Sequence, residues 1–320
     1  GKRSLNLPHK TIDFKINSKF KLPKYKKLKA FVRTYGCQAN IIDSEFITHI
    51  LKTLGFGITS EISKADLIIL NTCAIRQNAE NKVYGEIGLL NKYRRKNKNF
   101  KLVVCGCMAQ QEKTYNKLIK NVHVDLVFGT HNIDQLPLLL ADIYQNNSHV
   151  YAVKHNKEFL FNFIPRCLET KHKAFVSIMD GCNNFCTYCI VPYTRGQQIS
   201  RPKEDVINEV KKLIKEGCKE ITLIGQNVND YGIDFKDQEY VFKDLLEDVA
   251  KLDIKRIRFS TSNPWNFDRH IVDVIKKHDN IMPAIHLPIQ SGDNGILKAM
   301  NRKMDIKDYV ELVQHMKDQI

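Results

Sequence analysis

Short apolar runs alternate with longer amphipathic stretches along most of this chain. In its first half the runs are KAFVRTY, DLIILN, KLVVCG and VDLVFG, at residues 29–35, 66–71, 101–106 and 124–129. The first is followed by a helical pattern that we expect to open near Asp43 and Ser44. Strands that alternate with helices pair in parallel, because each helix carries the chain back to the same end of the sheet. The sequence therefore predicts an α/β protein that begins with a doubly wound parallel sheet.

The second half repeats the pattern. Apolar runs stand at residues 173–179, 220–225, 256–260 and 283–289, and a helical pattern covers 305–320. Four such strands, followed by helical stretches, predict a second sheet of β/α units that resembles a barrel.

The domain boundaries follow from these two blocks of alternation. We expect a basic flexible arm at 1–27, a first domain at 28–145, a polar linker at 146–171 and a second domain at 172–320. Between Lys10 and Lys29 the arm carries eight lysines, opposed only by Asp13.

Composition limits the class of protein. The 320 residues suffice for two separate cores, and 43% hydrophobic with 27% charged residues is typical of soluble globular proteins. No apolar run approaches the roughly 20 residues that span a membrane, and the first residues lack the apolar core of a secretory signal. Nine cysteines, an odd number, favour a reducing compartment. We expect a cytoplasmic monomer with no membrane contact.

The net charge of +15 indicates a nucleic-acid partner, because lysine and arginine displace counterions from phosphates. A compositional bias toward lysine and asparagine is the alternative explanation.

Cys182, Cys186 and Cys189 form a C-x3-C-x2-C run within 181–196. Three thiolates this close can hold three irons of a [4Fe–4S] cluster and leave the fourth iron for another ligand, such as S-adenosylmethionine. A zinc site, which prefers paired C-x2-C elements and a fourth ligand, stays an alternative, as does chance. His172 lies ten residues before Cys182, and the chain has no second C-x2-C.

Cys37, Cys73 and Cys107 each follow one of the first three predicted strands. The carboxyl ends of parallel strands lie along one edge of a sheet, so these residues should meet there and could hold a second cluster. Three unrelated buried cysteines are the alternative. Our expectation for the remaining cysteines is a structural role: Cys105, Cys167 and Cys218.

The run GCNNFCTYCIVPYTRG resembles the radical SAM signature, and its IVPYTRG extension is typical of the methylthiotransferase branch. TYGCQAN, NTCAIRQNAENKVYGE and VVCGCMAQ resemble the N-terminal domain of the same family. The resemblance implies two [4Fe–4S] clusters, an auxiliary one at Cys37, Cys73 and Cys107 and a radical SAM cluster at the second trio. It also implies that Tyr188 packs near the adenine of S-adenosylmethionine.

The predicted strand ends of the second domain are rich in small and polar residues. Such loops can bind a zwitterionic cofactor, although they also serve as plain turns and caps. The candidates for binding S-adenosylmethionine are Gly225, Gln226, Asn227, Ser260, Ser262, Gln290 and Ser291. The resemblance implies a six-stranded partial barrel of the radical SAM type and a C-terminal RNA-binding TRAM domain, and we expect the last strands and that domain to be absent here.

The resemblance is nearest to the branch that acts on isopentenylated adenosine in tRNA. It implies methylthiolation of N(6)-isopentenyladenosine at tRNA position 37 through a 5′-deoxyadenosyl radical, with tRNA and an electron donor of the flavodoxin or ferredoxin type as partners and an unidentified sulfur donor. Arg195 is expected near the RNA, where Gln198 and Ile199 depart from the family pattern. The alternatives are branches that modify threonylcarbamoyladenosine in tRNA or a ribosomal protein, or a non-enzymatic iron–sulfur or zinc protein that binds RNA.

Overall fold

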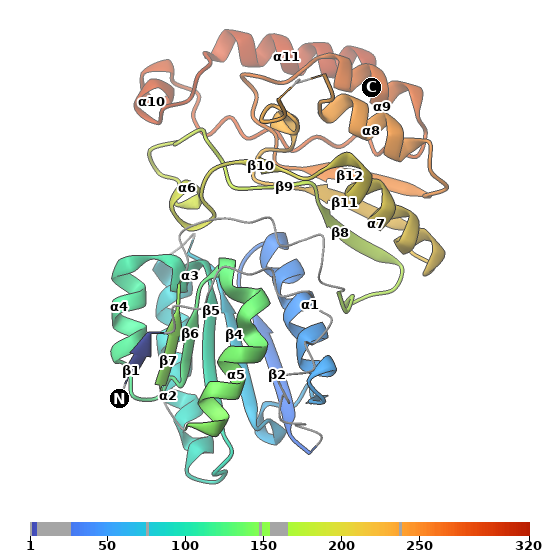
Figure 1. Cartoon of the computed structure of the whole chain (residues 1–320). Coiled ribbons are helices and arrows are strands. Elements are labelled where there is room, and N and C mark those ends of the chain that lie inside the picture. The colour runs from blue at the N-terminus through green and yellow to red at the C-terminus, as the bar shows by residue number, and fades with distance from the viewer. Residues whose placement is uncertain (1, 5–26, 75–76, 147–148, 154–165, 237–238) are drawn as a thin grey trace. The chain divides into compact units, whose positions relative to one another are not determined.

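The computed structural model divides the chain into two compact units, Gly1–Cys167 and Leu168–Ile320 (Figure 1). It describes residues 2–4, 27–74, 77–146, 149–153, 166–236 and 239–320. Most of the predicted basic arm and much of the predicted linker lie outside the described residues.

The first unit is built on a seven-stranded sheet whose order is β1-β7-β6-β5-β4-β2-β3, and every neighbouring pair in it is parallel. The strands are β1 (Lys2–Ser4), β2 (Lys29–Thr34), β3 (Gly57–Ile58), β4 (Leu67–Thr72), β5 (Lys101–Gly106), β6 (Leu126–Phe128) and β7 (His149–Ala152). The four runs predicted as strands in this half are β2, β4, β5 and β6. The predicted α/β class with a parallel sheet is confirmed.

Helices connect these strands, and Figure 1 shows α1 and α5 together in front of the sheet. The helices are α1 (Gln38–Thr53), α2 (Gln77–Arg94), α3 (Cys107–Gln110), α4 (Glu112–Lys120) and α5 (Leu136–Gln145), with 3-10 turns at Ile62–Lys64 and Thr130–Gln135. Strands β4 and β5 are buried at every position. Since both faces of a doubly wound sheet are covered by helices, its central strands are continuous apolar runs rather than alternating ones.

One helix begins earlier than its sequence predicts. We expected the first helix to open near Asp43 and Ser44, but α1 begins at Gln38, immediately after Cys37. The amide oxygen of Asn40 lies 3.5 Å from the backbone nitrogen of Cys37, so the side chain of Asn40 supports this start. The earlier start places Cys37 at the helix N-terminus.

Strand β7 lies in the range that its polar composition marked as a linker. Val150 and Ala152 point inward and are buried, whereas the two residues between and before them are partly exposed. The Nδ1 of His149 lies 2.7 Å from the carbonyl oxygen of Val124. A strand near the edge of a sheet needs only one buried face, so a polar stretch with two small apolar residues is sufficient.

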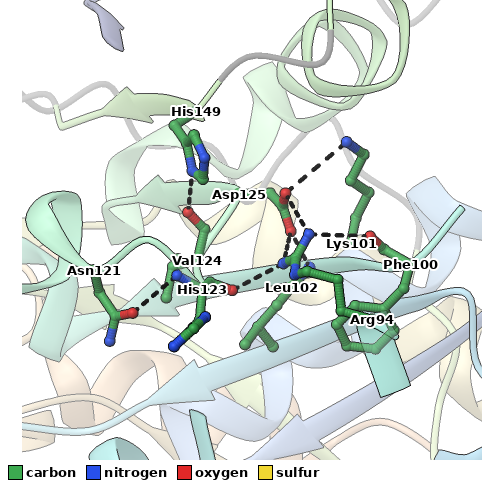
Figure 2. A network of polar contacts seen from close by, with 9 residues as sticks. All are labelled: Arg94, Phe100, Lys101, Leu102, Asn121, His123, Val124, Asp125 and His149. Atoms are coloured by element: carbon green, nitrogen blue, oxygen red, sulfur yellow. Dashed lines mark hydrogen bonds and ion pairs between the residues drawn. The ribbon is translucent and has the colours of Figure 1, made fainter. Parts of the chain in front are cut away.

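A buried carboxylate joins three elements at the amino ends of the strands (Figure 2). Asp125 accepts hydrogen bonds from Nη2 of Arg94 at 2.6 Å and from the backbone of Leu102 at 2.7 Å. Arg94 also donates to the carbonyl oxygen of His123 at 2.9 Å. Burial lowers the pKa of Lys101, and Asp125, whose carboxylate lies 3.9 Å from its Nζ, acts in the opposite direction. The end of α2 and the starts of β5 and β6 are thus held at one point.

The second unit contains a three-stranded parallel sheet in the order β12-β11-β8 and a short antiparallel pair, β9 with β10. The strands are β8 (Lys173–Ser177), β9 (Met179–Asp180), β10 (Ile199–Ser200), β11 (Glu220–Ile224) and β12 (Arg256–Ser260). The helices are α6 (Val191–Thr194), α7 (Lys203–Lys215), α8 (Phe242–Ala250), α9 (His270–Lys277), α10 (Asn294–Ala299) and α11 (Ile306–Gln319), with a 3-10 turn at Val228–Asp230. Within the described ranges, no helix combines the length and the apolar character needed to cross a membrane.

The strand predicted at 283–289 does not form. Instead the chain touches the sheet through one parallel bridge between Ile257 and Ile281. Pro283 and Pro288 stand in the predicted run, and proline has no N–H to donate to a neighbouring strand. The described parallel sheet of this unit therefore has three strands, where the sequence predicts four.

Candidate functional site

Two of the cysteines that follow strands leave the sheet side by side. Thr72 and Gly106 are paired in the register of β4 and β5, and Cys73 and Cys107 come directly after them. Gly106 has φ +93°, and a Cβ atom at this position would lie 2.4 Å from the carbonyl oxygen of Thr72. Glycine is therefore required at this point, because a side chain would separate the two strand ends.

The third cysteine of this trio is brought to the same edge by the turn after β2. Strand β2 is the neighbour of β4 on its other side. Gly36 has φ +118°, and a Cβ atom there would lie 2.4 Å from Cβ and 2.9 Å from Sγ of Cys73. The turn that carries Cys37 thus packs directly against Cys73. The trio predicted to meet at the carboxyl edge of the sheet is found along that edge.

Two buried asparagines, which no sequence motif marks, hold this edge together. The amide nitrogen of Asn40 donates to the carbonyl oxygen of Thr72 at 3.0 Å, and that of Asn71 donates to the carbonyl oxygen of Asn40 at 2.8 Å. Asn71 also donates to Oγ of Ser44 at 2.9 Å. The thiol of Cys37 donates to the amide oxygen of Asn40 at 3.4 Å. Their only sequence signal is their closeness to Cys37 and Cys73.

The other cysteines differ in their surroundings. Cys105 lies inside β5, is 1% exposed, and burial raises the pKa of its thiol well above the ordinary value. Cys218 is buried and donates to the carbonyl oxygen of Glu220 at 3.1 Å. The backbone nitrogen of Cys167 donates to the carbonyl oxygen of Glu45 at 3.2 Å. Cys105 is thus a core residue, in agreement with the structural role expected for it.

In the second unit Cys182, Cys186 and Cys189 lie on the loop that β9 and β10 close. The antiparallel pairing of these two strands brings the ends of the loop together. Inside it, the backbone nitrogen of Cys182 donates to the carbonyl oxygen of Gly196 at 3.1 Å, and that of Cys189 donates to Cys186 at 2.8 Å. The loop is thus a compact element with fixed ends.

The sulfurs of this loop influence one another. Burial raises the pKa of the Cys182 thiol, and the neighbouring Cys186 raises it further, while hydrogen bonds from Asn184 oppose the shift. The amide nitrogen of Asn184 lies 3.2 Å from Sγ of Cys182. Burial likewise raises the pKa of Cys189, and Cys182 and Cys186 add to the effect. Negative charge on all three sulfurs therefore needs a positively charged centre between them.

A buried carboxyl group lies near the same loop. Asp230 is 7% exposed, burial raises its pKa, and the side chains of Asn227, Asn184 and Asn266 oppose that shift. Asp230 in turn contributes to the raised pKa of Cys182.

Among the described residues, no group of three or more His, Cys, Asp or Glu side chains is arranged so that it could hold a metal ion. The ligand roles of both trios stay predictions.

The structure adds Arg302 to this site, which no sequence pattern indicated. The residue is 6% exposed. Nη1 lies 3.9 Å from Sγ of Cys186 and 3.4 Å from the hydroxyl oxygen of Tyr188, and Nη2 donates to the carbonyl oxygen of Pro288. The guanidinium carbon is 4.5 Å from the centre of the Trp265 ring. A buried cation is thus held against the cysteine loop.

The residues just before Arg302 bind the backbone of the loop. Asn301, with φ +56°, donates to the carbonyl oxygens of Asn184 and Phe185, at 3.1 Å each. The backbone nitrogen of Thr187 donates to the carbonyl oxygen of Met300 at 3.2 Å. The residues at the end of α10 therefore hold the cysteine loop in place, although more than a hundred residues of sequence separate the two.

Several residues predicted to bind S-adenosylmethionine follow β11. The amide oxygen of Gln226 is buried and has no hydrogen-bond partner among the described residues. Asn227 accepts from the backbone nitrogen of Asn263 at 2.9 Å. A Cβ atom on Gly225 would lie 2.4 Å from Cγ of Met179. Glycine at this position therefore permits β9, the strand that contains Met179, to approach the end of β11 closely.

Two more of these residues belong to β12 and the loop after it. Ser260 is the last residue of the strand. The hydroxyl oxygen of Ser262 is buried and, like the Gln226 oxygen, has no partner among the described residues. Buried polar groups are nearly always hydrogen-bonded, so these two atoms are open to a water molecule or a ligand. The polar lining fits the amino and carboxylate groups of the expected cofactor.

The remaining predicted residues lie in other settings. Gln290 is exposed and has φ +78°, and Ser291 accepts from the backbone nitrogen of Asp293 at 3.2 Å, as a turn residue does. Tyr188 is 50% exposed. Arg195 is 3% exposed, with Nη1 3.7 Å from the carboxylate of Asp180. The binding roles of these residues stay predictions.

Two family models match the chain. Residues 29–129 match the Uncharacterized protein family UPF0004, and residues 176–320 match the Radical SAM superfamily.

Curated relatives match across both units. The tRNA-2-methylthio-N(6)-dimethylallyladenosine synthase of Malacoplasma penetrans is 51% identical over 292 residues, which are 90% of this chain and 59% of the relative. The protein of the same name from Staphylococcus haemolyticus is 48% identical over 322 residues, covering 100% of the chain and 62% of the relative. The chain spans about three fifths of the length of the curated relatives it matches.

Solved structures agree in fold. The radical S-adenosylmethionine methyltransferase TsrM from Kitasatospora setae matches with a TM-score of 0.63 and 12% identity over 91% of this chain and 66% of its own. The cobalamin-dependent S-adenosylmethionine radical enzyme OxsB matches with a TM-score of 0.63 and 12% identity over 90% of this chain and 47% of its own. The chain is thus similar to the Uncharacterized protein family UPF0004 in its first unit, to the Radical SAM superfamily in its second, and over both units to tRNA-2-methylthio-N(6)-dimethylallyladenosine synthases.

Proposed function

We propose that the protein methylthiolates N(6)-isopentenyladenosine at position 37 of tRNA by radical SAM chemistry. The observation that carries the proposal is the presence of two separate cysteine trios, one on a strand edge and one on a closed loop, in a chain about half identical to synthases named for this modification. One trio alone would support only radical chemistry. The second trio supports the insertion of sulfur.

The chain supplies a separate set of cysteines for each cluster. Cys182, Cys186 and Cys189 would hold one [4Fe–4S] cluster and the strand-end trio a second, and these clusters supply, when bound, the electron that cleaves S-adenosylmethionine and the sulfur that is transferred. Three thiol donors on one loop fit a cluster with one iron open to the cofactor. On the sheet, Gly36 and Gly106 allow the three strand ends to approach each other closely.

Polar groups at the ends of β11 and β12 would bind S-adenosylmethionine. The buried amide oxygen of Gln226 can accept a hydrogen bond from its amino group, and the buried hydroxyl of Ser262 can accept from the amino group or donate to the carboxylate. A ligand there would satisfy atoms that otherwise stay without partners. Tyr188, a half-exposed residue of the cysteine loop, would offer a ring face to the adenine. These groups would orient the cofactor and exclude water from it.

The partners follow from charge and chemistry. The net charge of +15 supports binding to tRNA. The reaction needs an electron donor of the flavodoxin or ferredoxin type and a sulfur donor whose identity is open. We further propose that the protein acts in the cytoplasm as a monomer.

Two triple variants test the cofactors. After anaerobic reconstitution the wild-type chain should hold about eight irons, and alanine at either trio should leave about four. Alanine at Cys182, Cys186 and Cys189 should abolish cleavage of S-adenosylmethionine. The matched variant at Cys37, Cys73 and Cys107 should still cleave it but transfer no sulfur. Cleavage that persists in the first variant would refute the assignment.

The substrate is tested in cells. Mass analysis of tRNA nucleosides from cells that lack the protein should show loss of the 2-methylthio group from isopentenyladenosine and from no other nucleoside. Loss from threonylcarbamoyladenosine instead would assign the protein to a different branch, and an unchanged tRNA with an altered ribosomal protein would assign it to the third.

A further inference from the structure

Arg302 is a buried cation with no carboxylate within ion-pair distance among the residues that the structure describes. It is 6% exposed, and its Nε is buried without a hydrogen-bond partner. Removing a charge from water costs several kcal/mol unless an opposite charge compensates it. The residues that the structure describes therefore leave this guanidinium without a compensating negative charge.

The charges of three other buried arginines in this protein are each compensated by a nearby carboxylate. Arg201 is 4% exposed and ion-paired with Glu209. Arg195 is 3% exposed, with its Nη1 3.7 Å from the carboxylate of Asp180. The guanidinium of Arg166 lies 2.8 Å from the carboxylate of Glu45. Arg302 differs from all three, because its close neighbours are a thiol, a phenol, a carbonyl oxygen and an indole ring.

The geometry around Arg302 directs its charge toward the cysteine loop. Nη1 is 3.9 Å from Sγ of Cys186, while the carbonyl oxygen of Pro288 accepts from Nη2. Trp265 lies against one face of the guanidinium, with 4.5 Å to the ring centre, and so restricts its position. Asn301, the preceding residue, holds the loop through two backbone carbonyl oxygens. The cation and the loop are thus fixed relative to each other.

We propose that Arg302 is a positioning residue whose counter-charge is the iron–sulfur cluster carried by Cys182, Cys186 and Cys189. This inference rests on the proposed function, and it goes further in giving a residue outside the cysteine motif a role in the electronics of the cluster. Reduction adds one electron, and hence one negative charge, beside the guanidinium. A cation at this place stabilises the reduced state more than the oxidised state, and so raises the reduction potential.

The test compares midpoint potentials in the full chain. Cys37, Cys73 and Cys107 are first changed to alanine, so that only the loop cluster remains. Arg302→Met is then compared with the unchanged arginine, with Arg302→Lys, which keeps the charge, and with Lys298→Met, which removes an exposed charge from α10 nearby. The reduced cluster is followed by its electron paramagnetic resonance signal during titration with dithionite, and iron per chain is counted.

We expect Arg302→Met to lower the ratio of reduced to oxidised cluster at least tenfold at a fixed potential, which corresponds to about 59 mV for one electron. Arg302→Lys should keep the ratio of reduced to oxidised cluster within threefold of its value with arginine. Lys298→Met should leave that ratio unchanged. If Arg302→Met takes up no iron, Arg302→Gln takes its place, because glutamine keeps a hydrogen-bond donor without the charge. It should show the same tenfold decrease in the ratio of reduced to oxidised cluster.

An unchanged potential in Arg302→Met, or in Arg302→Gln where that variant is needed, overturns the inference and leaves the proposed function intact. A wild-type chain that takes up no iron at the loop overturns both, so that the two failures are distinguished.

Discussion

Gly36 lies so close to Cys73 that a Cβ atom on the glycine would stand 2.4 Å from the Cβ of the cysteine. No side chain fits between them. The conformation adds to this constraint, because φ of +118° is one that residues other than glycine rarely adopt. The turn after β2 can therefore reach the strand end that carries Cys73 only with glycine at this position.

Gly36→Ala should separate Cys37 from Cys73. We expect iron in the reconstituted chain to fall from about eight to about four, while cleavage of S-adenosylmethionine persists. The strained backbone should also lower the free energy of unfolding by about 1–3 kcal/mol. Gly85→Ala is the matched control, because nothing lies within 4 Å of its Cβ position on α2, and it should raise stability by about 0.5–1 kcal/mol. Full iron content in Gly36→Ala would contradict the expectation.

Asp125→Ala should destabilise the first unit. The change leaves the buried N–H of Leu102 without its acceptor and deprives Arg94, whose side chain is 31% exposed, of its carboxylate. Leaving a buried donor without an acceptor costs about 1–3 kcal/mol, and loss of the partly exposed ion pair adds less than about 1 kcal/mol. Urea unfolding measures the effect. Glu61→Ala, which breaks an exposed pair with Lys64, should cost less than about 1 kcal/mol, and similar losses in both variants would contradict the role of the network.

Glu247 should make stability depend on acid pH. Its hydrogen bond with Lys277, at 2.7 Å, and its contact with His278 lower the pKa of the carboxyl group from 4.5 to about 2. The lowered pKa means that the unfolded chain binds the proton more tightly, so this contribution is present above about pH 4.5 and is lost as the pH falls toward 2. Unfolding free energies across that window should fall less steeply in Glu247→Gln. Glu311→Gln, at an exposed pair, should keep the wild-type slope.

Ser262→Ala should affect the free chain and the complex in opposite directions. The buried hydroxyl oxygen has no partner among the described residues, so its removal should leave the free energy of unfolding unchanged or raise it by about 1 kcal/mol. Loss of one hydrogen bond to S-adenosylmethionine should weaken binding about 3- to 10-fold. Calorimetry measures both. Thr170→Ala, which removes a hydroxyl that donates to the carbonyl oxygen of Lys173, should leave the affinity unchanged.

The central strands could be predicted from sequence because burial on both faces leaves a continuous apolar signal. The predictions at the periphery were poorer for physical reasons. Strand β7 needs to bury only Val150 and Ala152, which gives too short a pattern to separate it from a polar connection. The run at 283–289 is apolar but contains Pro283 and Pro288, and its apolarity outweighed the loss of backbone donors in the prediction.

The candidate site divides in the same way. Cysteines are chemically distinctive, so Cys37, Cys73 and Cys107 could be selected by their position after predicted strands. Asn71 and Arg302 could not, because asparagine and arginine are common on surfaces and their roles arise only from contacts. Arg302 lies 116 residues from Cys186, and no local pattern encodes that contact.

The positions of the two cysteine trios depend on different features of the chain. Residue spacing determines them on the loop, and the parallel register of β2, β4 and β5 determines them at the sheet edge. On the loop between β9 and β10, the number of residues between cysteines determines where their sulfurs lie, so an insertion of one residue would move a ligand. At the sheet edge, hydrogen bonds between strands determine position, and the helices between them can lengthen or shorten without effect on it. A search for related sites should therefore count residues between cysteines for the loop, but for the sheet it should count from the last paired residue of each strand.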